Sequence, residues 1–268
     1  MRMIRRKSNM MILFVFAVCF CASTIGGICG IGGGVVIKPL LDATGVMSVS
    51  TVSFLSGLTV LAMSLISVYK NRKTKELDAK RSVPLGLGAA VGGVLGKRLF
   101  EMIKQAVGAD QLVGMIQAIV LGIMVLGTLI HVRNKAHIRT KNVRSTPVAV
   151  VIGLLLGMCS SFLGIGGGPM NLAVLYYFFS MGTKQAAVNS ILIILMSQTM
   201  SLMMSLATGS VPVFEVPVLL AMVCAGALGG FLSAKLHRKL TAEMTDKLFS
   251  GLLVVIFLIC CYNALKWM

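Results

Sequence analysis

Apolar residues fill most of this chain in long runs that short polar breaks separate. Four of these runs, at 10–37, 112–130, 146–183 and 185–214, contain no charged residue. An apolar run of about 18 or more residues is long enough to cross the ~30 Å hydrocarbon core of a membrane as a helix. The runs and their breaks predict eight spanning helices, at 10–30, 48–69, 83–100, 112–132, 147–163, 185–207, 216–236 and 247–266.

Two further apolar stretches, 31–46 and 165–182, are short and begin with glycines. We expect them to be re-entrant or half-membrane helices, because irregular backbone inside a membrane must be buried in protein or line a cavity. The expected fold is an all-α polytopic membrane protein. About eight transmembrane helices form two four-helix repeats, each with one glycine-headed re-entrant or half helix.

An internal repeat supports this division. The pentapeptide Gly-Ile-Gly-Gly-Gly occurs at 30–34 and again at 164–168, 134 residues later in a chain of 268. Ser56 and Ser190 keep the same offset, and the glycine-rich segment 88–95 resembles 225–232. We therefore expect a first transmembrane repeat at 1–132, a basic cytoplasmic linker at 133–146 and a second transmembrane repeat at 147–268. Glycine pairs in membrane helices also allow close helix packing, which is the explanation we favour for 92–93 and 229–230.

Composition and charge agree with a membrane protein. The hydrophobic fraction is 57% and the charged fraction only 12%, whereas soluble domains carry roughly 25% charged residues. The net charge of +17 comes largely from basic clusters at 2–7, 70–81 and 133–144, between apolar runs. Such clusters are typical of cytoplasmic loops in membrane proteins. A nucleic-acid partner is not expected, since the chain has no basic soluble domain.

The basic loops also predict an orientation. We expect the chain in the plasma membrane with its N-terminus in the cytoplasm, although the uncharged 208–215 loop and the basic 235–247 segment fit this poorly. Four full crossings per repeat make the copies parallel, whereas five make them inverted, the usual arrangement around a midplane site. We favour four crossings because five would place the basic 70–82 loop outside.

Residues for acid–base or metal chemistry are scarce. The seven cysteines lie in apolar runs, and the histidines at 131, 137 and 237 lie at run ends or in basic loops. The eight acidic residues all fall in loops or at run ends, with Asp42 and Glu215 closest to the apolar runs. We therefore expect no metal, no cofactor and no enzymatic activity, since acid–base catalysis needs titratable groups in the site.

The glycine motifs are the main candidate site. Glycine adopts backbone conformations that other residues avoid, and the N–H groups at a helix start together with the helix dipole bind anions. Two such starts side by side would hold one oxyanion between them. The alternative is that the glycines only permit a tight turn and close packing. The residues of this candidate site are Gly30, Gly32, Gly33, Gly34, Gly164, Gly166, Gly167 and Gly168.

Polar residues near these motifs are further candidates. Lys38 follows the first motif and would balance the charge of an anion, or else extend to the membrane interface. Asn171 follows the second motif. Ser56, Asn189 and Ser190 lie early in the next helices, where they would bind substrate oxygens or join neighbouring helices. Gln117 and Gln198 are weaker candidates, for which we favour a packing role.

The segments 26–41 and 162–172, with their paired glycine motifs, resemble the TauE/SafE sulfite-exporter-like permeases, also called the toluene-sulfonate uptake permease family. The resemblance covers essentially the whole chain. It implies transport of sulfur-containing or organic anions, such as sulfite or sulfonates, and it carries over onto the glycines and Lys38-Pro39. The second copy departs from the first, with Leu172-Ala173 where Lys38-Pro39 stands.

Together these observations predict a membrane transporter for a small anionic substrate, with sulfite or an organosulfonate as the leading class. The alternative is a membrane scaffold or assembly protein without transport activity, whose glycines serve packing alone.

Overall fold

The computed structural model describes residues 2–134 and 138–266, with side chains from Met10 onward except that of Asp110. His137 and part of the predicted 133–146 linker thus lie outside the described residues. The described chain is helical, with ten helices and no strand. The helices are α1 (Arg2–Cys29), α2 (Gly34–Thr44), α3 (Val49–Asn71), α4 (Ala79–Val107), α5 (Asp110–Arg133), α6 (Thr146–Leu163), α7 (Pro169–Phe179), α8 (Thr183–Ala207), α9 (Val216–Lys239) and α10 (Ala242–Lys266).

Eight of these helices are long and apolar enough to span a membrane, and the two short ones, α2 and α7, follow the glycine motifs. The predicted all-α membrane fold is confirmed. Helix ends follow local signals: Ser48 caps α3 by accepting from the backbone N–H of Thr51, and Gly108 ends α4 in a left-handed conformation. The predicted helix 83–100 ended too early, because charged residues follow position 96, whereas α4 continues to Val107.

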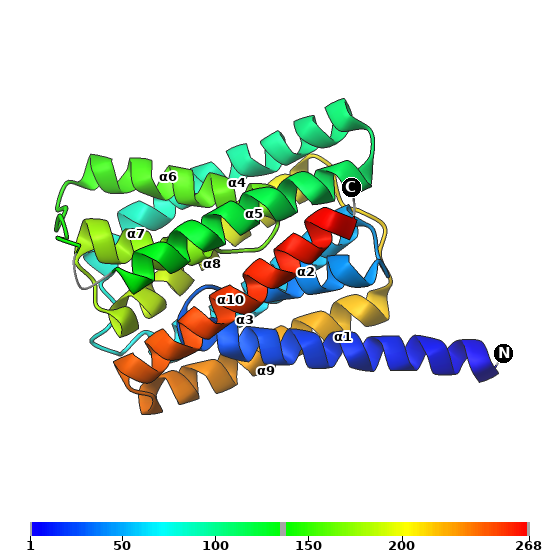
Figure 1. Cartoon of the computed structure of the whole chain (residues 1–268), viewed down its shortest axis with the longest axis horizontal. Helices are drawn as coiled ribbons and strands as arrows, with labels where there is room; N and C mark the ends of the chain where they lie inside the picture. Colours follow the sequence, from blue (N-terminus) through cyan, green and yellow to red (C-terminus); the bar gives the residue numbers. More distant parts are fainter. Residues whose placement is uncertain (1, 135–137, 267–268) are drawn as a thin grey trace.

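One end of the helix bundle, which we call the linker end, carries the connection between α5 and α6 (Figure 1). Hydrogen bonds join distant segments here: Arg81 at the start of α4 donates to Phe179 O at the end of α7 (2.8 Å), and Thr183 of α8 donates to Asp246 of α10 (2.9 Å). The α3–α4, α7–α8 and α9–α10 connections therefore share this end.

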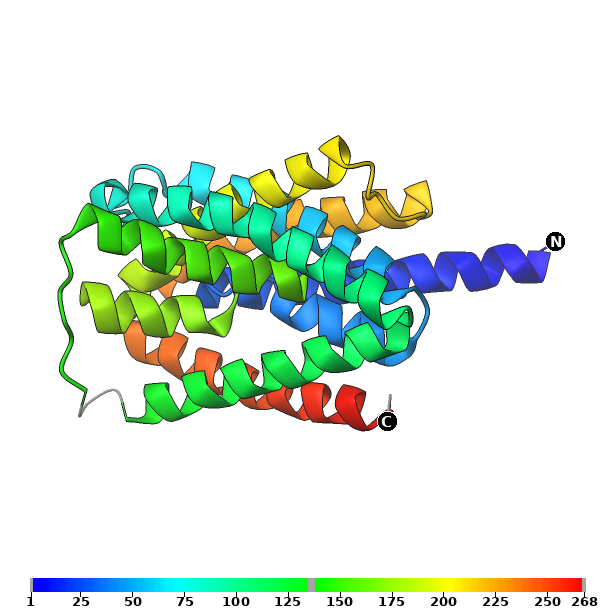
Figure 2. The ribbon, with the colours of Figure 1, turned by 90° about the horizontal axis from the view of Figure 1, so that it is seen from above.

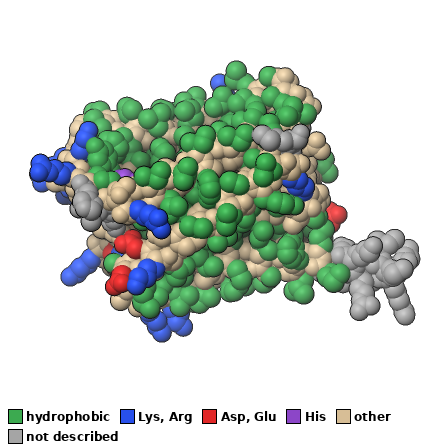
Figure 3. All heavy atoms as spheres, in the orientation of Figure 1, with side chains coloured by type: hydrophobic (Ala, Val, Ile, Leu, Met, Phe, Trp, Pro, Cys, Tyr) green, Lys and Arg blue, Asp and Glu red, His purple; other side chains and the backbone are tan. Residues whose placement is uncertain are grey.

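The opposite end, which we call the terminal end, is where α1 begins and α10 ends (Figures 1 and 2). Lys104 near the end of α4 donates to Ser50 of α3 (2.6 Å), and Lys266 of α10 donates to Ala43 O of α2 (2.8 Å). The α2–α3, α4–α5 and α8–α9 connections lie here. The side surface between the two ends is largely apolar on the face shown in Figure 3, with basic side chains gathered toward the linker end.

The first glycine turn bends the chain back toward the end from which it entered. Gly30, just after α1, lies against the first turns of α8 near the linker end, where an added Cβ would come within 2.3 Å of the Cα of Ala187. A Cβ added at Gly32 would lie 3.5 Å from Val60 and Ile194, in the middle of α3 and α8. From there α2 leads back to the terminal end. The stretch 31–46 thus returns the chain to the end where α1 begins, so α3 starts there as well.

The second half follows the same course in the opposite direction. α6 starts at the linker end, Gly164 contacts Ser53 near the start of α3, and α7 leads back to the linker end. Ser53 and Ala187, the residues met by the two turns, are themselves 134 residues apart. The halves therefore run antiparallel, and the N-terminus and the linker lie at opposite ends. Which of the two ends faces the cytoplasm stays a prediction.

Glycine faces hold the two halves against each other. A Cβ added at Gly88 or Gly92 of α4 would lie 2.0 Å from a carbonyl oxygen of α6, and one at Gly229 of α9 would lie 2.6 Å from the Cβ of Ser23 in α1. The first helix of each half thus packs on a helix of the other half at backbone contact, as expected for small residues at membrane helix interfaces.

Candidate functional site

The two glycine turns meet in the middle of the bundle. A Cβ at Gly34 would lie 1.9 Å from the carbonyl oxygen of Ile165, and one at Gly167 would lie 2.9 Å from that of Ile31. The turns themselves need glycine, because Gly30, Gly32, Gly164 and Gly166 all have φ between +63° and +79°. The contact between the turns is what the packing explanation predicts. An anion held between the turns stays a prediction.

The polar candidates beside the turns lie in different surroundings. Ser56 donates to Gly164 O (2.7 Å), and Asn171 is buried. The Oγ of Ser190 is buried and has no hydrogen-bond partner in the part of the chain that the structure describes. Asn189 accepts from Ser82 (2.5 Å) and donates to Glu76 O (2.8 Å) at the linker end. These contacts of Asn189 join separate segments, which agrees with a role in packing rather than in binding substrate oxygens.

Lys38 forms an ion pair inside the protein. Its Nζ lies 2.5 Å from Oδ2 of Asp42, one helical turn later on α2, and the two side chains are 3% and 5% exposed. Asp42 lies in the last turn of α2, at the end of its apolar run as expected, but α2 buries it inside the bundle. Because Asp42 balances the charge of Lys38, this lysine is not an uncompensated positive group.

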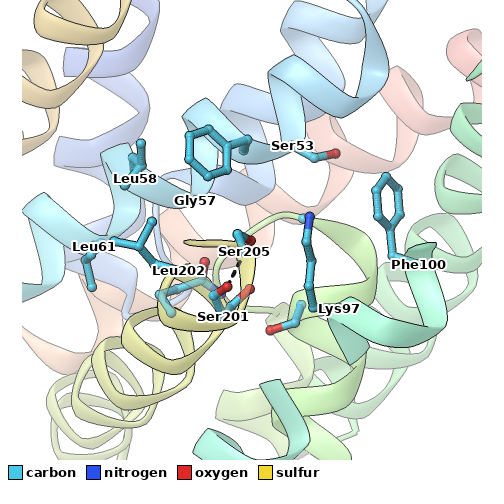
Figure 4. A pocket seen from close by; sticks show the side chains of 13 residues that line it. Ser53, Gly57, Leu58, Leu61, Lys97, Phe100, Ser201, Leu202 and Ser205 are labelled. Atoms are coloured by element: carbon cyan, nitrogen blue, oxygen red, sulfur yellow. Dashed lines mark hydrogen bonds between the residues drawn. The ribbon is translucent and has the colours of Figure 1, made fainter. Parts of the chain in front are cut away.

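A polar pocket lies on the terminal-end side of the second glycine turn. It lies between α3, α4, α8 and the end of α6, and about 40 Å³ of it is open to the centre of a water molecule. Lys97 extends into it from α4 toward serines of α3 and α8 (Figure 4). The lining residues are Ser53, Phe54, Gly57, Leu58, Leu61, Lys97, Phe100, Ser161, Gly164, Gln198, Ser201, Leu202 and Ser205.

Hydrogen-bond donors without partners distinguish this pocket. Ser53 Oγ, Ser161 Oγ and Gln198 Nε2 are all buried, and none has a partner among the described residues. A buried polar group left unpaired costs about 1–3 kcal/mol, so three around one pocket indicate that a ligand or water completes them. Lys97 is 14% exposed and pairs loosely with Glu101, at 3.8 Å. The pocket thus combines one lysine with several donors, as an oxyanion requires.

A wider cavity connects this region to the terminal end. Lys97 and Phe100 line both spaces. The other residues of the wider cavity are Ser50, Glu101, Lys104, Gln105, Gly108, Thr208, Ser210, Val211 and Pro212, at the α4–α5 and α8–α9 connections. Lys97 therefore stands between the surface and the pocket.

Sequence reasoning missed Lys97 and the serines of α8. Lys97 follows Gly93 by one helical turn, and Gly93 faces Ser161 and Ser197. Ser197, Ser201 and Ser205 recur every four residues, which places them on one face of α8. The small-residue face of α4 therefore pointed to the lysine, but packing was the explanation favoured for the glycine pair on that face.

Comparisons with known proteins agree with this architecture. Over residues 15–259 the chain matches the family described as sulfite exporter TauE/SafE. It is 25% identical over 258 residues to the probable membrane transporter protein YunE of Bacillus subtilis. This match covers 88% of this chain and 92% of that relative. It is also 25% identical over 166 residues to the probable membrane transporter protein MJ0441 of Methanocaldococcus jannaschii, 58% of each chain. No solved structure matches it.

Proposed function

The chain belongs to the sulfite exporter TauE/SafE family, and on that premise we propose that it carries sulfite or an organosulfonate across the plasma membrane. It is a multi-pass membrane transporter with a small-molecule substrate. The observation that carries the finer proposal is Lys97 in a pocket with three buried groups that no described residue pairs with, Ser53 Oγ, Ser161 Oγ and Gln198 Nε2.

The chemistry of the pocket fits a sulfur oxyanion. A sulfonate or sulfite group presents three oxygens around one sulfur, and each oxygen accepts hydrogen bonds. Lys97 supplies a positive charge, while Ser53, Ser161 and Gln198 supply donors from three different helices. Glu101 lies on the outer side, in the wider cavity, where it pairs with Lys97 when no anion is bound. One lysine with a nearby carboxylate favours anions of low charge.

Charge distribution supports an orientation with the linker end in the cytoplasm. Basic residues gather there, as the positive-inside rule requires of cytoplasmic loops. They are Lys70, Arg72, Lys73, Lys75, Lys80, Arg81, Arg133, Arg139, Lys141, Arg144, Lys184, Lys235, Arg238, Lys239 and Lys247. The N-terminus then lies outside, in place of the cytoplasmic side expected from the sequence, and the cluster at 2–7, Lys104 and Lys266 are exceptions. In this orientation the pocket opens toward the outside.

The antiparallel halves support a transport mechanism. We propose that 1–132 and 147–268 are inverted repeats joined by a cytoplasmic linker at 133–146. Inverted repeats with broken helices that meet at the midplane are a common design of secondary transporters, in which one half-site opens to each side in turn. A purely structural scaffold gives no reason for unpaired donors in a pocket, and the pocket lacks the paired acid and base of a hydrolase.

Flux measurements on purified protein test this function. Proteoliposomes would be assayed for saturable uptake of radiolabelled sulfite, thiosulfate, sulfoacetate and taurine, with chloride as a comparison anion. We expect saturable flux of at least one sulfur anion, inhibited by the unlabelled compound. A scaffold predicts no saturable flux of any of them, and that result would overturn the proposal.

A further inference from the structure

A second polar cavity lies beside the ion pair of Lys38 and Asp42. It is enclosed by α2, α5, α10 and the second glycine turn, and it has room for about one water molecule. Gln117 of α5 and Asn263 of α10 line it with the ion pair, and all four polar side chains are at most 5% exposed. Four polar side chains in so small and buried a space are costly unless their groups are paired.

Three oxygen acceptors in this cavity lack a donor. The amide nitrogen of Gln117 donates to Phe162 O (2.6 Å), and that of Asn263 donates to Pro39 O (2.8 Å). These bonds fix both amides, because only the NH₂ groups donate. The remaining atoms, Gln117 Oε1, Asn263 Oδ1 and Asp42 Oδ1, have no partner in the described part of the chain. The site therefore needs a donor.

We propose that Asp42 is a proton-binding site that couples anion transport to proton movement. This proposal rests on the proposed function. The carboxylate Oδ1 takes up one proton from water at the terminal end, and the resulting O–H donates to a neighbouring acceptor in the cavity. Lys38 keeps its bond to Oδ2. Release reverses the step, so no other reactant is required.

The small size of the cavity favours a proton over a metal cation. Lys38 on α2 lies 2.5 Å from Asp42, and Lys266 on α10 reaches Ala43 O next to it. Both ammonium groups disfavour added positive charge at Asp42, but a proton needs only one oxygen, to which it binds covalently, whereas a metal ion needs several oxygen ligands and more room than one water molecule occupies. Among the described residues, Cys260 of α10 is a further titratable group close to the pair. The lining residues from α5 and from the second turn, Gln117, Leu163 and Ile165 among them, do not titrate.

One short segment separates the proton site from the anion pocket. Ser161 and Gly164 line the anion pocket, whereas Leu163 and Ile165 line the cavity beside Asp42. Gln117 binds the carbonyl of Phe162 between them. Protonation of Asp42 changes what Gln117 and its neighbours bind, and residues 161–165 carry that change to the anion pocket. The two sites thus share a wall through which they are coupled.

Proton movement during transport tests the proposal. Proteoliposomes that contain a pH-sensitive dye and little buffer receive sulfoacetate, whose sulfonate does not titrate near neutral pH, or whichever sulfur anion of the panel is carried. The parent should move a fixed number of protons per anion. Asp42→Asn should lower that ratio at least tenfold. Glu243→Gln is the matched control, since Glu243 forms an exposed i,i+4 pair with Lys247, and it should keep the parent ratio.

Other outcomes contradict the proposal in distinct ways. An unchanged ratio in Asp42→Asn, or anion flux driven by a sodium gradient but not by a pH gradient, would overturn the proton site and leave the transport function standing. Absence of any anion flux in the parent would overturn the function instead.

A second measurement does not depend on flux or on the folding of Asp42→Asn. In infrared difference spectra of the aspartate-labelled parent between high and low pH, we expect the carbonyl band of a buried carboxylic acid. Gln117→Leu should shift this band by removing an acceptor. No such band, or a band that Gln117→Leu leaves in place, would count against Asp42.

Discussion

Ser56 Oγ donates a 2.7 Å hydrogen bond to the carbonyl oxygen of Gly164, which joins α3 of the first half to the glycine turn of the second. The bond holds the wall of the anion pocket, since Gly164 lines that pocket. Ser190, which stands 134 residues after Ser56, has a buried Oγ without a partner among the described residues. The two halves follow the same course but differ here. Ser56 binds the glycine turn of the other half, whereas Ser190 binds no described residue.

Replacement of Ser56 should destabilise the protein more than replacement of Ser190. Ser56→Ala removes a buried hydrogen bond and leaves Gly164 O unpaired, which costs about 1–3 kcal/mol. Ser190→Ala removes a hydroxyl that binds nothing described and should be neutral or stabilising. Thermal unfolding of the purified variants in one detergent compares them. Equal unfolding temperatures would mean that the bond at Gly164 contributes nothing.

Contact between the two turns makes Gly34 intolerant of a side chain. A Cβ at this position would lie 1.9 Å from the backbone oxygen of Ile165, so Gly34→Ala must push the turns apart. We expect loss of monodisperse protein in size-exclusion chromatography.

Gly251 is the matched control, because it lies within α10 and a Cβ there meets nothing within 4 Å. Gly251→Ala should be tolerated, with a gain of about 0.5–1 kcal/mol in helix propensity. Well-folded Gly34→Ala protein would show that the turns are not in the contact described.

The antiparallel arrangement makes a topological prediction. Lys141 lies in the linker, whereas Ser210 lies in the α8–α9 connection at the other end. A membrane-impermeant maleimide applied to intact cells should label Ser210→Cys above the parent background and should label Lys141→Cys only after the cells are permeabilised. The reverse pattern would place the linker outside, and labelling of both variants in intact cells would contradict opposite ends.

The sequence allowed most of the helices to be predicted, because a membrane demands long apolar runs and glycine clusters mark the breaks. The course of the chain at the first turn could not be predicted in the same way. A short apolar stretch such as 31–46 is compatible with two courses. It can be a re-entrant loop that leaves on the side where it entered, or a helix such as α2 that returns the chain to the side where α1 begins. That choice reverses the direction of every later helix in the half.

The pocket was harder to predict than the helices, since its residues come from separate segments. Lys97 stood at the edge of an apolar run, where a lysine usually extends to the interface. Only the packing of α4 against α6 and α8 turns it toward Ser161 and Gln198. Likewise the burial of the Lys38–Asp42 pair could not be predicted, because it depends on the packing of α2 against α5 and α10.

The role of Lys97 in anion transport is the central claim, and flux through a Lys97 variant tests it most directly. Lys97→Met keeps much of the side chain length but removes the charge and the donors. Loss of a charged hydrogen bond costs about 1.5–3 kcal/mol, so kcat/KM for the transported sulfur anion should fall about tenfold or more, with partial recovery in Lys97→Arg. Lys239→Met, at an exposed position of the linker end, should transport as the parent does. Parent-like flux in folded Lys97→Met protein would contradict the account.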